Sequence, residues 1–187
     1  MESNVRLDLP DFDETLRPTW PGMRNGGEEG GWGAGSQLVQ IHEHLRVNAR
    51  ELLAAIDELI AGGTDIDGAR AIVRDLSSRQ GYSAVGSFCS GFCTLLTMHH
   101  SIEDRSVFPG LGRVEPQLVP VLRRLMAEHE VIAEIIGLVY EAIDAAEEDR
   151  RQAIGLKRIA EHLRDRLFSH LRYEEAQLVP ALNAHGF

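Results

Sequence analysis

The sequence has few of the residues on which several classes of protein depend. It contains two cysteines, Cys89 and Cys93, too few for a disulfide-stapled secreted domain. We interpret them as small packing residues on one helix, with a redox pair or soft metal ligands as the alternative. No apolar run approaches the roughly 18–20 residues of a membrane-spanning helix, and the N-terminus lacks a signal-peptide pattern. These absences predict a cytoplasmic protein without a membrane partner.

Basic residues are also scarce, because 19 Lys and Arg stand against 29 Asp and Glu and leave a formal net charge of −10. Nucleic acids and anionic membrane surfaces both need a basic footprint on the protein that binds them. The charge balance therefore predicts that neither is a partner. The length of 187 residues is enough for one domain with a sizeable core.

Residues 1–35 differ in composition from the rest of the chain. They hold three of the seven prolines, the glycine-rich run GGEEGGWGAG and no helical apolar period. We predict an extended arm over residues 1–35, ordered where Phe12, Trp20 or Trp32 finds a groove, with a mobile tail as the alternative. Residues 36–187 then form the folded body.

Four segments place apolar residues at alternating steps of three and four, which predicts four amphipathic helices. They span about 36–61, 83–108, 117–146 and 151–175. Ser36 is the expected N-cap of the first helix, Pro109 should lie just beyond the second, and Pro120 fits the first turn of the third. We also expect a shorter helical segment at 65–79 and a last turn or short helix after Pro180. Short connections without strand-like alternation predict an all-α, antiparallel, up-and-down four-helix bundle.

Each predicted helix carries one histidine on its core-facing stripe. The four are His42, His99, His129 and His170. The stripe of the second helix passes through Leu95, His99 and Ile102. A single core histidine is usually a satisfied packing residue, but one on every helix needs another explanation.

Two of these histidines have a glutamate four residues later and a proline six residues after that. The stretches are HHSIEDRSVFP, with His99, Glu103 and Pro109, and HLRYEEAQLVP, with His170, Glu174 and Pro180. Positions i and i+4 share one helix face, so each stretch presents an imidazole beside a carboxylate. Burying four imidazoles and two carboxylates together is costly unless a metal neutralises and ligates them. The residues therefore predict a metal centre.

The order H…HxxxE…H…HxxxE, closed by FP and VP, resembles the hemerythrin-like (HHE cation-binding) domain over about residues 36–184. The resemblance implies two non-haem iron ions with an oxo or hydroxo bridge. It implies that His42, His99, His129 and His170 are terminal ligands and that Glu103 and Glu174 bridge the ions. Six protein ligands leave coordination positions open on two octahedral irons, so the expected partners are small molecules such as O2, peroxide or NO.

One residue departs from the oxygen-carrying members of that family, which place a second histidine one turn after the first on the third helix. Here Ala133 occupies that position and cannot ligate. The departure shifts the expectation from reversible O2 carriage toward reaction with O2 or peroxide, including catalase-like decomposition of peroxide. The alternatives are a module that senses O2, NO or iron without turnover, and a metal-free structural bundle.

Several neighbouring residues leave the ligand set open. His44 competes with His42, because the stripe favours His42 while the preceding glutamate, as at Glu128-His129, favours His44. His100 and Asp104 form another i, i+4 pair, which we interpret as neighbours or supports of the ligands. The sequence contains neither the Glu-x-x-His motif of ferritin-like di-iron bundles nor an HExxH zinc motif.

Overall fold

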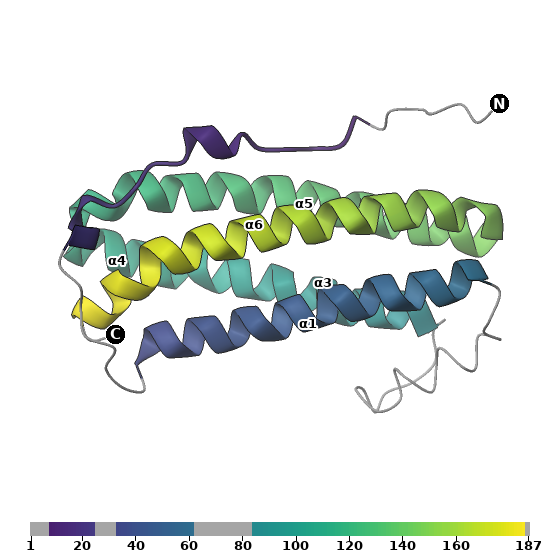
Figure 1. Ribbon diagram of the computed structural model, residues 1–187, viewed down its shortest axis with the longest axis horizontal. Coiled ribbons are helices and arrows are strands. Elements are labelled where there is room, and N and C mark those ends of the chain that lie inside the picture. Colours follow the sequence, from purple (N-terminus) through teal and green to yellow (C-terminus); the bar gives the residue numbers. More distant parts are fainter. Residues whose placement is uncertain (1–7, 25–32, 62–83, 186–187) are drawn as a thin grey trace.

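The computed structural model describes residues 8–24, 33–61 and 84–185, and within these ranges it contains helices and no strand (Figure 1). Four long helices lie side by side. They are α1 (Ala34–Ala61), α3 (Ala84–Ile102), α5 (Val119–Glu148) and α6 (Ala153–His185). This confirms the predicted helical bundle. The shorter segment predicted at 65–79 lies outside the described residues.

The first helix begins earlier than predicted. It starts at Ala34, so Ser36 lies inside it and is not its N-cap. The backbone N–H groups of Ser36 and Gln37 both donate to the carbonyl of Gly33, at 3.0 and 3.2 Å. Glycine tolerates the cap position at a small cost, so the helix needs no Ser side chain there.

The second helical run also differs from the prediction. α3 ends at Ile102 and continues as a π-helix, Glu103–Val107, and then as α4, Phe108–Val114. Pro109 therefore lies in the first turn of α4, inside the second helical run and not just beyond its end. The backbone N–H of Phe108 donates to the carbonyl of Glu103 across the wider turn. Ile102, predicted to face the core, is 54% exposed.

The last two helices follow the predicted pattern more closely. A 3-10 turn, Pro116–Leu118, precedes α5, and Pro120 lies in the first turn of α5 as predicted. A second 3-10 turn, Arg150–Gln152, precedes α6. α6 continues through Pro180 to His185 without the break that we predicted after residue 175. The proline removes only one backbone donor close to the end of a long helix.

Two clusters of buried apolar residues hold the bundle together. One includes Leu45, Phe92, Ile132 and Leu163, and the other includes Phe108, Leu118, Leu125 and Leu178. Each of the four helical runs passes from one cluster to the other. On α5, for example, His129 lies between Leu125 of one cluster and Ile132 of the other. The predicted site residues therefore form a polar layer between two apolar layers.

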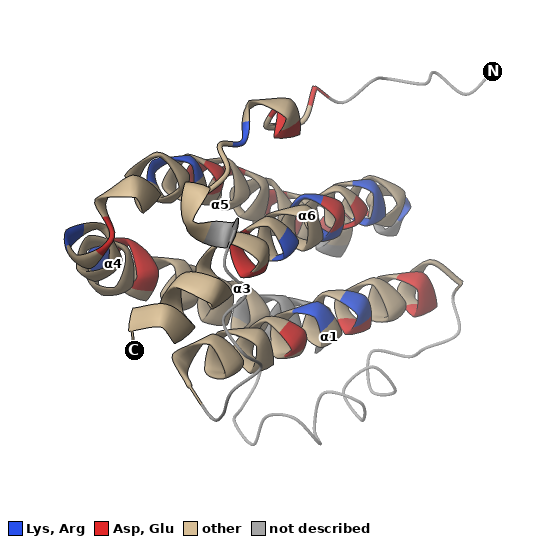
Figure 2. Ribbon diagram, turned by 60° about the vertical axis from the view of Figure 1, so that its left-hand side comes forward, with Lys and Arg blue, Asp and Glu red and all other residues tan. Residues whose placement is uncertain are grey.

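Residues 8–24 lie along α5 and α6, and their Phe12 and Trp20 side chains are buried (Figure 1). This segment contains two 3-10 turns, Glu14–Leu16 and Pro21–Arg24. Figure 2 shows Lys and Arg interspersed with Asp and Glu along α1, α5 and α6. Among the described helices, none combines the length and the apolar character needed to cross a membrane.

Candidate metal centre

The four predicted histidines meet in two pairs inside the polar layer. The Nε2 atoms of His42 and His99 lie 3.1 Å apart, and those of His129 and His170 are also 3.1 Å apart. All four side chains are buried. Two imidazole nitrogens bound at about 2.1 Å to one metal ion and at right angles to each other lie about 3.0 Å apart. Each pair therefore has the spacing of two donors to a single ion.

Glu103 and Glu174 each lie close to two histidines, one from each pair. One Glu103 oxygen lies 3.2 Å from His99 Nε2, and the other lies 3.7 Å from His129 Nε2. Glu174 Oε2 lies 3.5 Å from the Nε2 atoms of both His42 and His170. The two carboxylates thus connect the pairs across the centre of the bundle.

Neither carboxylate has a hydrogen-bond partner that satisfies it. Both oxygens of Glu103 and both of Glu174 are buried without one. Burial and the neighbouring Glu174 raise the pKa of Glu103 to about 11. Burial also opposes ionisation of Glu174, but His170, His42 and His99 outweigh it and lower its pKa to about 2. Unsatisfied buried carboxylate oxygens of this kind fit a bound cation, which would neutralise and ligate them.

Carboxylates outside the predicted ligand set orient three of the histidines. Each of these rings directs Nε2 toward the centre and donates its Nδ1–H to a carboxylate on another element. The pairs are His42 with Glu175 and His129 with Asp104, both at 2.9 Å, and His170 with Glu128 at 3.1 Å. Metal-ligating histidines are commonly held this way, because the bond fixes the tautomer that leaves Nε2 free to ligate.

The protonation of these histidines follows from their burial and their partners. Burial lowers the pKa of His42, His100 and His129, and it lowers that of His99 to about 4. Burial acts on His170 in the same direction, but its hydrogen bond to Glu128 and the nearby carboxylate of Glu174 prevail and raise its pKa. The proton on His170 Nε2 therefore lies where a metal ion would bind, between the Nε2 atoms of His129 and His170. Without this proton the lone pairs of these two atoms would face each other.

The structure distinguishes between residues that the sequence left as alternatives. His42 is buried in the centre, whereas His44, two residues later, is exposed. His100 is buried and stacks on His129 with 3.9 Å between ring centroids. Its Nε2 has no hydrogen-bond partner. Ala133 is exposed, so a side chain at that position would point away from the centre.

The described side chains include two groups whose potential ligand atoms all lie within 4.8 Å of one another. They are His42, His99, Glu103 and Glu174 in one group, and His100, His129 and His170 in the other. The structure thus brings all six predicted site residues together and adds His100. Sequence analysis missed Glu128 and Glu175 as supports. Their positions in the sequence could have indicated this role, because each is an acidic residue next to a predicted ligand.

Imidazole nitrogens together with carboxylate oxygens fit a divalent transition metal better than a purely oxygen-liganded ion such as Ca²⁺. The fold and the site therefore define a helical bundle with a buried, cation-binding cluster of His and Glu. The family model of the hemerythrin HHE cation-binding domain matches residues 34–182. The chain belongs to this family, which confirms the resemblance seen in the sequence. Neither curated proteins nor solved structures gave a match to the chain.

Proposed function

We propose that this protein binds two non-haem iron ions in the His/Glu layer and reacts there with O2 or peroxide. His42 and His99 would hold one ion, His129 and His170 the other, and Glu103 and Glu174 both. The observation that carries the proposal is the pairing of Nε2 atoms at 3.1 Å on either side of two buried carboxylates with unsatisfied oxygens. Bound iron would supply the redox chemistry with O2 and peroxide that no side chain provides.

The protein side chains have three roles in this proposal. The Nδ1–H bonds to Glu175, Asp104 and Glu128 keep the imidazoles oriented toward the ions. The apolar clusters on either side of the layer exclude water from the centre. His100 lies close to His129 and His170, and its Nε2 atom has no hydrogen-bond partner. This nitrogen is therefore available to a metal ion or to a bound small molecule.

The test combines metal analysis with peroxide turnover. The iron-loaded protein should contain two iron ions per chain, and Mössbauer spectra should show two coupled ferric ions. Peroxide consumption should disappear in Glu103→Ala and Glu174→Ala. A fully iron-loaded wild-type protein that leaves peroxide untouched would refute catalase-like activity. Wild-type protein that takes up no iron would favour the metal-free structural bundle.

A second candidate function is a module that senses O2, NO or iron without turnover. One observation favours it: the described N-terminal segment reaches the centre through Arg17, which binds the Glu128 carboxylate that supports His170. A change at the metal could thus reach a segment on the protein surface. Reversible spectral changes on exposure to O2 or NO, without consumption of peroxide, would identify this function. The cytoplasmic location and the antiparallel, up-and-down helix order remain predictions within the proposal.

A further inference from the structure

The N-terminal segment is held against the bundle through its backbone. Three of its carbonyl oxygens accept hydrogen bonds from α5 and α6. They are Pro10 from His162 Nε2 at 2.7 Å, Asp13 from Arg124 Nη2 at 2.6 Å, and Pro18 from the Tyr173 hydroxyl at 2.7 Å. The backbone N–H of Trp20 also donates to Gln177 Oε1 at 2.7 Å. None of these bonds involves the side chain of Arg17. The segment therefore has anchors on the bundle that do not depend on this side chain.

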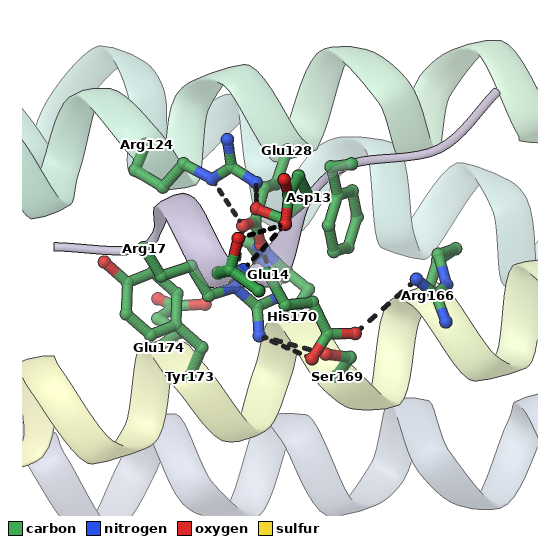
Figure 3. Close-up of polar contacts among 12 residues, drawn as sticks. Asp13, Glu14, Arg17, Arg124, Glu128, Arg166, Ser169, His170, Tyr173 and Glu174 are labelled. Carbon is green, nitrogen blue, oxygen red and sulfur yellow. Dashed lines mark hydrogen bonds and ion pairs between the residues drawn. The ribbon is translucent and has the colours of Figure 1, made fainter.

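The Arg17 side chain points inward from this segment to the buried Glu128 (Figure 3). Its Nε donates to Glu128 Oε1 and its Nη2 to Glu128 Oε2, both at 2.8 Å. Nη1 donates to the Ser169 hydroxyl at 3.0 Å. The guanidinium also lies 4.7 Å from the centroid of the Tyr173 ring. Arg17 is thus fixed by a two-pronged ion pair and by contacts on α6.

The Glu128 side chain has no exposed surface, and Arg17 is the partner that its two oxygens share. Oε1 accepts from Arg17 Nε and from Arg124 Nε, each at 2.8 Å. Oε2 accepts from Arg17 Nη2 at 2.8 Å and from His170 Nδ1 at 3.1 Å. Arg124 therefore grips one oxygen, whereas Arg17 grips both. Only Arg17 fixes the plane of the carboxylate and so the direction of the oxygen that His170 meets.

We propose that Arg17 is a positioning residue of the metal centre, which acts through Glu128 to hold the His170 ring in its ligating orientation. The inference rests on the proposed metal centre. It makes the N-terminal segment part of the site, although that segment precedes the residues matched by the family model. A lysine at this position would keep the charge but would lack the planar fork, so geometry and charge can be tested separately.

The test uses Zn²⁺ as a diamagnetic probe on the full-length chain. Zn²⁺ affinity is measured by competition with a chromophoric chelator, and the imidazole Nδ1–H signals of the loaded protein are followed by ¹H–¹⁵N NMR. In Arg17→Gln we expect affinity to fall about 10-fold, the lower end of the effect of losing a direct support, because Arg17 acts through Glu128. The Nδ1–H signal of His170 should shift and exchange faster. The signals of His42 and His129 should stay in place as internal references.

Arg166→Gln is the matched control. Arg166 also binds the N-terminal segment, with Nη1 2.9 Å from Asp11 Oδ1, but it does not contact Glu128. The Arg166→Gln substitution should change neither the Zn²⁺ affinity nor the position and exchange rate of the His170 Nδ1–H signal. Arg17→Lys should resemble Arg17→Gln more than the wild type. The combined Arg17→Gln and Glu128→Gln variant should lose no more affinity than Glu128→Gln alone, because both act through one contact.

The outcomes separate this proposal from the proposed function. If the wild-type protein binds no metal, the metal centre fails and the role of Arg17 fails with it. If the wild type binds Zn²⁺ and Arg17→Gln binds it equally, with an unchanged His170 signal, only the role of Arg17 is refuted. Full recovery in Arg17→Lys, or an equal loss in Arg166→Gln, would show that charge or general anchoring of the segment matters instead.

Discussion

Glu103→Gln should abolish tight metal binding while leaving the metal-free protein about as stable as before. The Glu103 side chain is buried, and its pKa of about 11 makes it a neutral carboxylic acid at pH 7 when no metal is bound. Glutamine has nearly the same shape and is also neutral. The substitution therefore removes no charge from the metal-free core, but it replaces a carboxylate ligand that could bind two ions with a weakly coordinating amide.

The expected sizes of the two effects differ. Exchanging one neutral polar group for another in the metal-free protein should change the free energy of unfolding by about 1 kcal/mol or less. One ion present at a thousand times its dissociation constant stabilises the folded state by about 4 kcal/mol. For a chain of this length, 1 kcal/mol corresponds to about 2–4 °C in Tm. Each bound ion should therefore raise Tm by about 8–16 °C in the wild type, and most of the metal-dependent increase should be missing in Glu103→Gln.

The assay is thermal unfolding of both proteins with and without anaerobic Fe²⁺, with Glu43→Gln as the control because Glu43 lies on the surface.

The pH dependence of stability supplies an independent check. The raised pKa means that Glu103 keeps its proton in the folded protein and loses it in the unfolded one between pH 4.5 and about 11, so the contribution of Glu103 to stability should fall as pH rises through this range. Glu103→Gln should lack this decline. A metal-free Glu103→Gln protein destabilised by several kcal/mol, or one that keeps the full metal-dependent shift, would refute the reasoning.

Three further predictions concern the neighbours of the centre. His42→Ala should lose metal binding, whereas His44→Ala, at an exposed position, should retain the wild-type stoichiometry in a metal titration. His100→Ala should weaken one of two binding steps in the same titration, and Ala133→His should strengthen neither because residue 133 is exposed. Burial would raise the pKa of Glu128, but hydrogen bonds from His170 and arginine lower it to about 2. Chemical denaturation of the metal-free protein should therefore show a loss of stability, as pH falls from 4.5 to 2, that is about 3 kcal/mol larger in the wild type than in Glu128→Gln.

Much of the fold could be predicted from the helical period alone. Apolar residues on α5 and α6 repeat at steps of three and four, and those at the repeating positions are buried: Leu122, Leu125, Ile132 and Ile136 on α5, and Leu156, Ile159, Leu163 and Leu167 on α6. His129 and His170 occupy stripe positions, so their direction follows from the positions of their apolar neighbours. Prolines were less informative about helix ends, because Pro109 fits a helix start and Pro180 is tolerated near a helix end.

The second helical run shows where periodicity becomes ambiguous. Adjacent residues on a helix are about 100° apart, so a stripe centred between His99 and His100 directs both rings inward. The sequence alone does not show whether the stripe is centred on His99 or between His99 and His100. For this reason His100 was interpreted as a neighbour of the ligands and Ile102 as a core residue. The π-helix at Glu103–Val107 adds a local change of period that no residue pattern in the stretch specifies.

The supporting carboxylates are hidden from sequence analysis for a different reason. Glu175 follows a predicted ligand on α6 but supports His42 on α1, and Glu128 precedes one on α5 but supports His170 on α6. An acidic residue one position from a ligand cannot share its direction on the helix, so it reaches the ligand of a neighbouring helix instead. The second, third and fourth helical runs, through Asp104, Glu128 and Glu175, therefore each orient a histidine that another helix carries. The orientation of the metal-binding atoms then depends on packing of the whole bundle, and a change that shifts one helix should disturb ligands on two.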